Sequence, residues 1–249
     1  MRRLILNILL ILAVFPAVAL SHTATDIVRA SDEKMRGQSS FTEITMQIIR
    51  HDWVRTMKMR GWTKGEDYSL ILVLDPARDK GSSSLKRGKE MWNWVPRIER
   101  VIKIAPSMLG QSWMGSDFTN DDLINQSSIV VDYTHTIIRE EVFDGTTCWV
   151  IEATPLLDAP VVWGKLVVWV SQCELNQRKV EFYDEFGDLI NTMSSYELKM
   201  LGGRLIPTRI EMQPVDKQGQ KTVLSYSAAE FDFDIDDDFF SLNQMRELR

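Results

Sequence analysis

Short segments that alternate apolar and polar residues, separated by turn-forming pairs, follow one another along most of this 249-residue chain. Alternation with a period of two is typical of β-strands, and pairs such as Asp144-Gly145 and Gly202-Gly203 favour tight turns. The candidate strands are residues 42–50, 53–59, 68–74, 86–95, 100–104, 129–143, 147–154, 163–171, 178–183, 190–200, 204–212 and 222–229. Ten or so strands with two or three short helices predict a mainly β protein. Its antiparallel sheet should curve strongly, into a closed barrel or into a half-barrel whose mouth a helix covers.

The segment at residues 68–74 is apolar on both faces. Leu70 and Leu72 share one face, and Ile71 and Val73 share the other. An antiparallel sheet with one face in water needs apolar side chains only at alternate positions. We therefore expect another part of the chain to cover the second face.

Two places carry helix-capping signals. Thr25 can cap a helix that runs to about Arg36. Thr119, with Asp122 three residues later, resembles a capping box that starts a second, brief helix. These helices are the candidates for covering the sheet.

The acidic and aromatic tail at residues 231–240 resembles a calcium-binding loop only superficially. Counted from Asp232, the tail lacks the glycine that an EF-hand loop needs at its sixth position. Alternation instead predicts that Phe231, Phe233 and Ile235 face inward, and the later aspartates can start a short helix.

The amino terminus has the pattern of an export signal. Arg2 and Arg3 precede an apolar stretch at residues 4–20, and Ala17-Val18-Ala19 supplies the small residues that signal peptidase recognises. We predict a signal peptide over residues 1–21 and export to the periplasm.

A membrane anchor that stays in place is the alternative, but Pro16 interrupts an apolar run that is already short for crossing a bilayer. No cysteine follows the small residues, which argues against an acyl anchor. The remaining residues 22–249 are expected to form one domain, since curved β domains of roughly this size are commonly single.

The charge balance argues against nucleic acid as a partner. Without Arg2 and Arg3, 27 basic side chains face 35 acidic ones, a net charge of about −8. Arg97, Arg100 and Lys103 form a local basic group that could contact an anionic head group or a partner protein. A solvated loop is the simpler interpretation of the same three residues.

The two cysteines, Cys148 and Cys173, lie close to the two ends of a predicted strand pair, residues 147–154 and 163–171. Folding the chain back between these strands brings Cys148 roughly opposite Val170, so a disulfide to Cys173 and two free thiols both remain open. Neither cysteine has a histidine near it in sequence, and neither is expected to be catalytic.

Aromatic and methionine side chains gather between residues 90 and 122. Six of these residues are candidate lipid contacts: Trp92, Trp94, Pro96, Trp113, Met114 and Phe118. Aromatic rings bury large apolar areas and methionine adapts to irregular partners such as acyl chains. Composition alone also fits an ordinary hydrophobic core.

The same region resembles the signature of the outer-membrane lipoprotein-sorting proteins, the LolA-like carriers. Met91-Trp92-Asn93-Trp94-Val95-Pro96 and Met114-Gly115-Ser116-Asp117-Phe118-Thr119 match the family pattern, and Asp121-Asp122 follows as the acidic pair. Trp113 stands where phenylalanine is usual and Asn120 where an aromatic residue is usual.

The basic turn between the two motifs departs further from the family, because Glu99 and Ile102 replace positions that are commonly arginine. This departure weakens the head-group interpretation of the turn. Weaker similarity covers most of the chain after residue 22.

The resemblance implies a half-open barrel of about eleven strands around an apolar cavity, with helices as a lid. A protein of this family would carry lipid, or the acyl chains of a lipoprotein, toward the outer membrane. An inner-membrane exporter and an outer-membrane acceptor are implied partners. We further expect a protein that works as a monomer, without a cofactor or a resident metal.

Enzyme functions have less support in the sequence. The histidines at positions 22, 51 and 135 belong to none of the common hydrolase motifs. A metal-assisted lipid hydrolase would have to use carboxylates, of which Asp117, Asp121 and Asp122 are the best candidates. A non-catalytic accessory subunit of an envelope transporter is the third alternative.

Overall fold

The computed structural model describes residues 23–124 and 128–248. The expected signal peptide over residues 1–21 lies outside the described residues. Of the helices in the described ranges, none combines the length and apolar character that crossing a bilayer requires.

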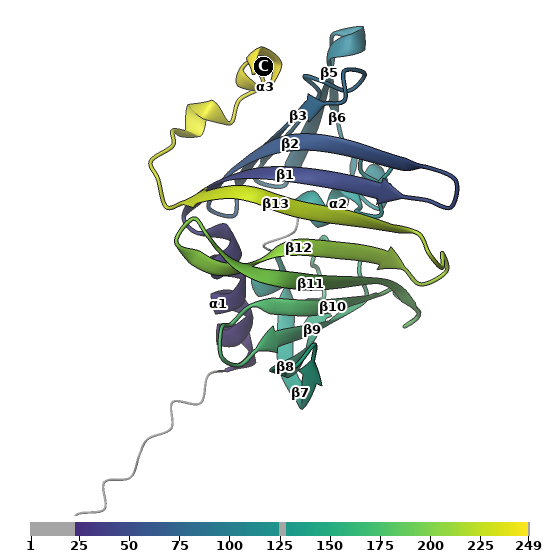
Figure 1. The fold of residues 1–249 in the computed structure, drawn as a ribbon, viewed down its shortest axis with the longest axis vertical. Coiled ribbons are helices and arrows are strands. Elements are labelled where there is room, and N and C mark those ends of the chain that lie inside the picture. Colours follow the sequence, from purple (N-terminus) through teal and green to yellow (C-terminus); the bar gives the residue numbers. More distant parts are fainter. Residues whose placement is uncertain (1–22, 125–127, 249) are drawn as a thin grey trace, which may run out of the picture.

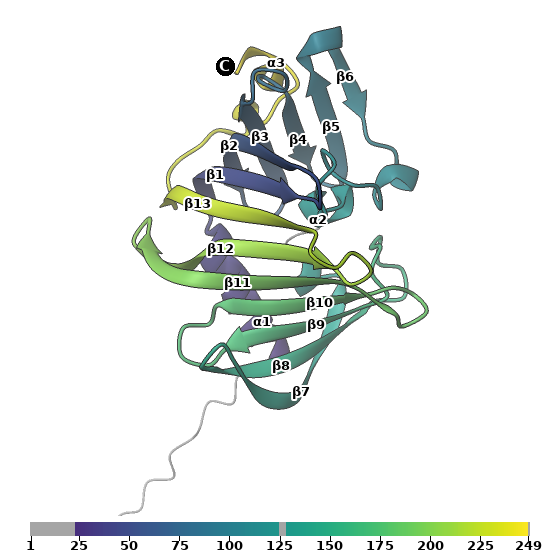
Figure 2. The same cartoon turned by 45° about the vertical axis from the view of Figure 1, so that its right-hand side comes forward.

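The described strands form one antiparallel sheet of 13 strands that curves around the molecule (Figures 1 and 2). The strands are β1 (Ser39–Ile49), β2 (Val54–Lys64), β3 (Tyr68–Asp75), β4 (Ser83–Arg87), β5 (Glu90–Val95), β6 (Arg100–Lys103), β7 (Tyr133–Phe143), β8 (Thr146–Pro155), β9 (Lys165–Ser171), β10 (Gln177–Tyr183), β11 (Leu189–Leu201), β12 (Arg204–Pro214) and β13 (Lys221–Phe231). Their spatial order is β6-β5-β4-β3-β2-β1-β13-β12-β11-β10-β9-β8-β7. The prediction of a mainly β, half-open barrel is confirmed, with 13 strands rather than about eleven.

The predicted strand at residues 86–95 is wrong in its bounds, because the chain reverses inside it. Arg87 pairs with Glu90 across a tight turn, and Gly88 adopts a φ of 56° there. Glycine reaches this left-handed conformation without the steric penalty of a side chain. The segment therefore supplies β5 and part of β4.

The first and last strands of the described chain, β1 and β13, are neighbours in the middle of the sheet. β1 pairs with β13 over most of its length, and each half of the sheet then continues outward by hairpins. Among the described strands, β6 pairs with β5 alone and β7 pairs with β8 alone, so no pairing joins the two edges and the barrel stays open.

Helix α1 (Ala24–Arg36) lies on the inner side of the curved sheet, where it contacts β7, β9 and β12 (Figure 1). Its N-cap is Thr23 rather than the expected Thr25. Thr23 and Asp26 make the reciprocal bonds of a capping box, whereas the Thr25 hydroxyl lies 3.1 Å from Nδ1 of His135.

The other helical elements are short. They are η1 (Pro96–Ile98), η2 (Pro106–Met108), α2 (Asn120–Ile124), η3 (Ser128–Val130), η4 (Asp237–Phe239) and α3 (Gln244–Glu247). The expected start of α2 is confirmed, because the Thr119 amide and the Asp122 carboxylate bond at 2.7 Å and the Asp122 amide donates to the Thr119 hydroxyl.

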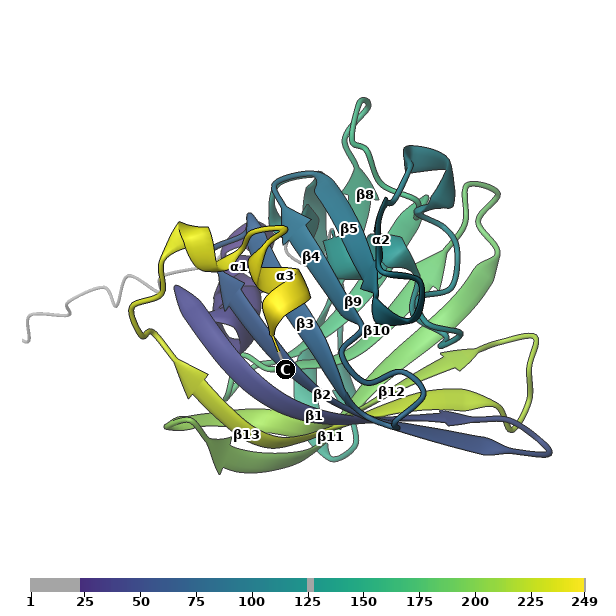
Figure 3. The same ribbon diagram turned by 90° about the horizontal axis from the view of Figure 1, so that it is seen from above.

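The two apolar faces of β3 are both covered, as expected. Val73 packs into the inner core, while Leu70 packs against Phe240 and Met245 on the outer face. Phe240 and Met245 belong to residues 232–248, which are named the C-terminal segment. This segment lies outside the sheet, over the end formed by β2 to β5 (Figure 3).

Candidate ligand-binding cavity

A cavity of about 230 Å³ lies between α1, the segment before α2 and the inner face of the sheet. Most of its wall is apolar. The principal apolar contributors are Trp113, Phe118, Trp163, Phe182, Met193 and Met212. Phe182, Met193 and Met212 lie on β10, β11 and β12, where inward-facing residues recur at every second position. Trp113, Phe118 and Trp163 reach the cavity from loops. Such a wall suits a flexible apolar ligand.

A tight loop places two of these aromatic residues. The amide of Trp113 donates to the Phe118 carbonyl at 2.8 Å, and Met114 and Gly115 adopt φ values of 51° and 78° between them. Positive φ at two successive residues closes the loop in a few residues. Trp113 and Phe118 therefore both face the cavity, with exposures of 3% and 8%.

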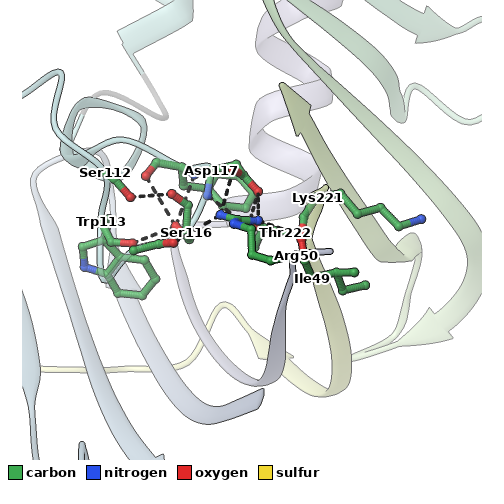
Figure 4. Close-up of polar contacts among 10 residues, drawn as sticks. Ile49, Arg50, Ser112, Trp113, Ser116, Asp117, Lys221 and Thr222 are labelled. Atoms are coloured by element: carbon green, nitrogen blue, oxygen red, sulfur yellow. Dashed lines mark hydrogen bonds and ion pairs between the residues drawn. The ribbon is translucent and has the colours of Figure 1, made fainter. Parts of the chain in front are cut away.

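Asp117 anchors this loop to the sheet (Figure 4). Its carboxylate receives two bonds from Arg50, at 2.9 and 3.0 Å, and one from the Thr222 hydroxyl at 2.7 Å. The Asp117 amide in turn donates to the Thr222 hydroxyl oxygen at 3.0 Å. The loop is thus tied to the end of β1 and to β13 at once.

A second polar chain ties the same loop to β4 and β5. The Trp113 indole Nε1 donates to the Ser84 hydroxyl at 3.2 Å, and Ser84 donates to the Asn93 side-chain oxygen at 2.7 Å. A buried indole N–H needs such an acceptor. The ring is therefore held in one orientation at the cavity wall.

The acidic pair that follows the motif is buried at the start of α2. The Asp122 carboxylate accepts from the Thr119 amide and from the Trp163 indole, the latter at 3.0 Å. Burial raises the pKa of Asp122 above its ordinary value, against the opposing effect of these bonds. Asp121, like Asp122, lines the cavity. Of the three carboxylates considered for a hydrolase, Asp117 and Asp122 are thus engaged in structural bonds.

The predicted aromatic contacts divide between the two faces of the sheet. Trp92 and Trp94 lie on the outer face, packed with the C-terminal segment, so the expectation that they line the cavity is wrong. Inward residues of β5 are instead Met91 and Asn93, because neighbours in a strand point to opposite faces.

Pro96 and Met114 are also outside the cavity wall. Pro96 starts η1 at the end of β5, and Met114 is half-buried behind Trp113 in the inner core. Of the six predicted contacts, Trp113 and Phe118 are the two that reach the cavity.

The basic group lies outside the cavity wall as well. Arg97, Arg100 and Lys103 are exposed on η1 and on the edge strand β6. Lys103 pairs with Glu90, and its ammonium lies 5.5 Å from the centre of the Trp92 ring. None of the three basic residues lines the cavity.

The disulfide alternative is wrong: Cys148 and Cys173 are both free. Cys148 is buried within β8, opposite Ser171, while Cys173 is exposed in the turn that follows β9. The turn carries Cys173 away from the packed face on which Cys148 lies.

Several cavity and anchoring residues have no motif that marks them in the sequence. Arg50 and Thr222 hold Asp117, while Ser31 and Met35 on α1 and Tyr226 on β13 contribute to the cavity wall. The helical spacing of Ser31 and Met35 places them on the buried face of α1, and this spacing is the signal that could have found them.

An open, curved sheet that holds an apolar cavity beneath a helix defines a class of half-barrel ligand-binding proteins. Comparison with known proteins agrees with this class. A family model described as that of an uncharacterized protein matches residues 65–247. A search of curated proteins finds no match.

Three examples from the solved structures are similar to this chain over most of its length. A DUF1329 family protein from Desulfovibrio piger is 26% identical, with a TM-score of 0.81 over 89% of this chain and 97% of that one. A LolA superfamily protein from Nitrosomonas europaea is also 26% identical, with a TM-score of 0.77 over 90% of this chain and 100% of the other. A putative outer membrane lipoprotein-sorting protein domain from Vibrio parahaemolyticus, 23% identical, has a TM-score of 0.77 over 90% and 98% of the two chains and shows the shared fold.

The matched family model covers most of the chain, and the structural matches extend the agreement to nearly all of it. This protein belongs to the LolA-like family.

Proposed function

We propose that this protein is a non-catalytic periplasmic carrier that binds lipid, or the acyl chains of lipoproteins, in its cavity and moves them toward the outer membrane. The observation that carries the proposal is the apolar cavity between α1 and the inner face of the sheet. The similar LolA superfamily protein adds support at the level of the family. An inner-membrane exporter would load the carrier and an outer-membrane acceptor would unload it. The carrier works as a monomer.

The physical need for such a carrier follows from the cost of moving an acyl chain through water. Each CH₂ group transferred to an apolar site contributes about 0.8 kcal/mol. A long chain therefore leaves a membrane slowly unless a protein shields it. Trp113 and Phe118 are the residues of the signature motif that would contact the chain.

Loading requires the cavity to open, and α1 is the element that would move. It packs on the sheet through apolar contacts of Ile27 and Val28 and closes one side of the cavity. Thr25 and His135, whose side chains meet at 3.1 Å, offer a place to fix α1 to β7. In a Cys173→Ser background, cysteines at positions 25 and 135 joined by a short thiol cross-linker should block lipid loading. Unimpaired loading of the cross-linked protein would count against α1 as the lid.

Native mass spectrometry with lipid extraction, on protein purified from the periplasm without detergent, tests the carrier function directly. Lipid should be present at a defined stoichiometry, and it should be intact. Filling the cavity with Met193→Trp should strongly reduce the bound fraction, while Thr192→Trp, on the opposite face of β11, should retain it. A Met193→Trp protein that folds and still carries the wild-type amount of lipid would refute this site, and turnover of the bound lipid would point to a hydrolase.

A further inference from the structure

The apolar cavity continues into a smaller, more polar pocket of about 150 Å³. The walls of the two share six residues, namely Asp32, Met35, Ile44, Ile71, Leu123 and Tyr226. The polar pocket is lined by hydroxyl groups and by the charged side chains of Arg36, Glu66 and Lys86. A ligand in the cavity would therefore meet a polar environment at one end.

Two hydroxyl groups of the apolar cavity wall, of which Tyr226 alone belongs to the shared region, have no hydrogen-bond partner among the described residues. Ser31 on α1 is 3% exposed and lines the apolar cavity, yet its Oγ makes no hydrogen bond to any residue that the structure describes. Tyr226 on β13 is half-buried and belongs to both walls, and no described residue hydrogen-bonds its hydroxyl. Leaving a buried polar group such as the Ser31 hydroxyl unsatisfied costs free energy, so such groups commonly have a partner. Both hydroxyls are available to a ligand.

The charges around these hydroxyls select against an anionic ligand group. The apolar cavity is lined by the carboxyls of Asp32, Asp121 and Asp122, and none of the described residues that line it is basic. An ionised phosphate or carboxylate there would face like charge in a poorly solvated site.

The two cations of the polar pocket are already engaged. Arg36 pairs with Asp32 and Glu66, and the Lys86 ammonium donates to the Glu66 carbonyl at 2.6 Å. Burial raises the pKa of Tyr226 to about 12, so its hydroxyl stays a neutral donor at physiological pH.

From these observations, and resting on the proposed carrier function, we propose that Ser31 and Tyr226 form a polar subsite that binds an uncharged oxygen acceptor of the lipid, the ester or amide carbonyl at which acyl chains join their head group. The apolar wall takes the chains. The hydroxyls give the carrier a preference for neutral acyl esters and amides over free fatty acid anions of the same length.

Displacement of a fluorescent apolar probe, N-phenyl-1-naphthylamine, tests the subsite. On the wild-type protein, 1-palmitoylglycerol should displace the probe at lower concentration than palmitate. Tyr226→Phe and Ser31→Ala each remove one oxygen and should weaken the 1-palmitoylglycerol affinity about 2- to 12-fold, the range expected for one neutral hydrogen bond. Affinity for the probe itself should stay the same. A triacylated lipopeptide is tested in parallel with 1-palmitoylglycerol. The ligand that loses more affinity in Tyr226→Phe and Ser31→Ala indicates whether a lipoprotein or a free glycerolipid supplies the carbonyl.

Tyr196→Phe is the matched control, because Tyr196 lies on β11 outside both cavity walls. It should bind every ligand as the wild type does. Unchanged 1-palmitoylglycerol affinity in both subsite variants, or tighter wild-type binding of palmitate than of the ester, would overturn the subsite. If the wild-type protein bound neither probe nor lipid, the carrier function itself would fail.

Discussion

Arg50 and Asp117, separated by 67 positions in the chain, form a two-pronged ion pair with N–O distances of 2.9 and 3.0 Å. The side chains are only 15% and 3% exposed. The pair connects the end of β1 to the loop that carries Trp113 and Phe118. Asp117, an acidic residue of the signature motif, thus anchors the loop that holds Trp113 and Phe118 at the cavity wall.

Asp117→Asn should lower the free energy of unfolding by about 2–4 kcal/mol, because a largely buried guanidinium would lose its carboxylate. Urea denaturation followed by circular dichroism measures this change. Glu90→Gln is the control, since Glu90 pairs with Lys103 where both side chains are about half exposed. Glu90→Gln should lower the free energy of unfolding by less than about 1 kcal/mol. An equal decrease in the free energy of unfolding in the two variants would show that the buried ion pair stabilises the fold no more than the exposed one does.

The C-terminal segment should contribute to stability without affecting lipid binding. Phe240 is fully buried against the outer face of the sheet, so Phe240→Ala should cost about 3–5 kcal/mol of unfolding free energy. The affinity for an apolar probe should not change, because the contact lies on the face opposite the cavity. Phe186→Ala, at a side chain 82% exposed, should change stability by less than about 0.5 kcal/mol. A loss of probe affinity in Phe240→Ala would contradict this separation of the two faces.

The curved antiparallel sheet could be predicted because strand alternation and turn pairs are local signals. The same signals indicated that β3 is covered on both faces. These local signals could not identify the segment that covers the outer face, because β3 and the C-terminal segment are far apart in the sequence and meet only in the folded protein. For this reason Trp92 and Trp94 were expected in the cavity, whereas they pack beneath Phe240 and Met245.

The cavity itself was only partly predictable. Trp113 and Phe118 belong to a contiguous motif and were identified, but Ser31 and Tyr226 come from the first helix and the last strand. No spacing in sequence links two such residues. Both line the cavity because β1 and β13 pair in the middle of the sheet and α1 lies across its inner face.

Arg204 should control how firmly the proposed lid is held. Its guanidinium donates to the carbonyl oxygens of Glu33 and Lys34, at 3.1 and 2.9 Å, near the carboxyl end of α1. Removing a cation from this end of a helix destabilises the helix terminus. Arg204→Ala should therefore increase the rate at which a bound apolar probe exchanges, as measured by stopped-flow fluorescence. Arg209→Ala, on the same strand but paired with Glu211, should leave the rate unchanged. A wild-type exchange rate in Arg204→Ala would argue against α1 as the moving element.

His135 should make the contact between α1 and the sheet sensitive to acid. Its Nε2 lies 2.7 Å from the Ile129 carbonyl oxygen, and its Nδ1 lies 3.1 Å from the Thr25 hydroxyl. Burial lowers the pKa of His135 below the ordinary value of 6.5. The unfolded chain therefore takes up a proton on this histidine at higher pH than the folded protein does.

The sign of the effect follows from this difference in proton uptake. Stability associated with His135 is present above about pH 6.5 and is lost as the pH falls below it. The raised pKa values of Asp32 and Asp122 act in the opposite sense, so the comparison must be made between variants. Urea denaturation between pH 7.5 and pH 5.5 should show a smaller loss of stability on acidification in His135→Asn than in the wild type. His51→Asn, at an exposed turn position, should keep the wild-type profile. Identical profiles for His135→Asn and the wild type would exclude His135 as a source of the pH dependence.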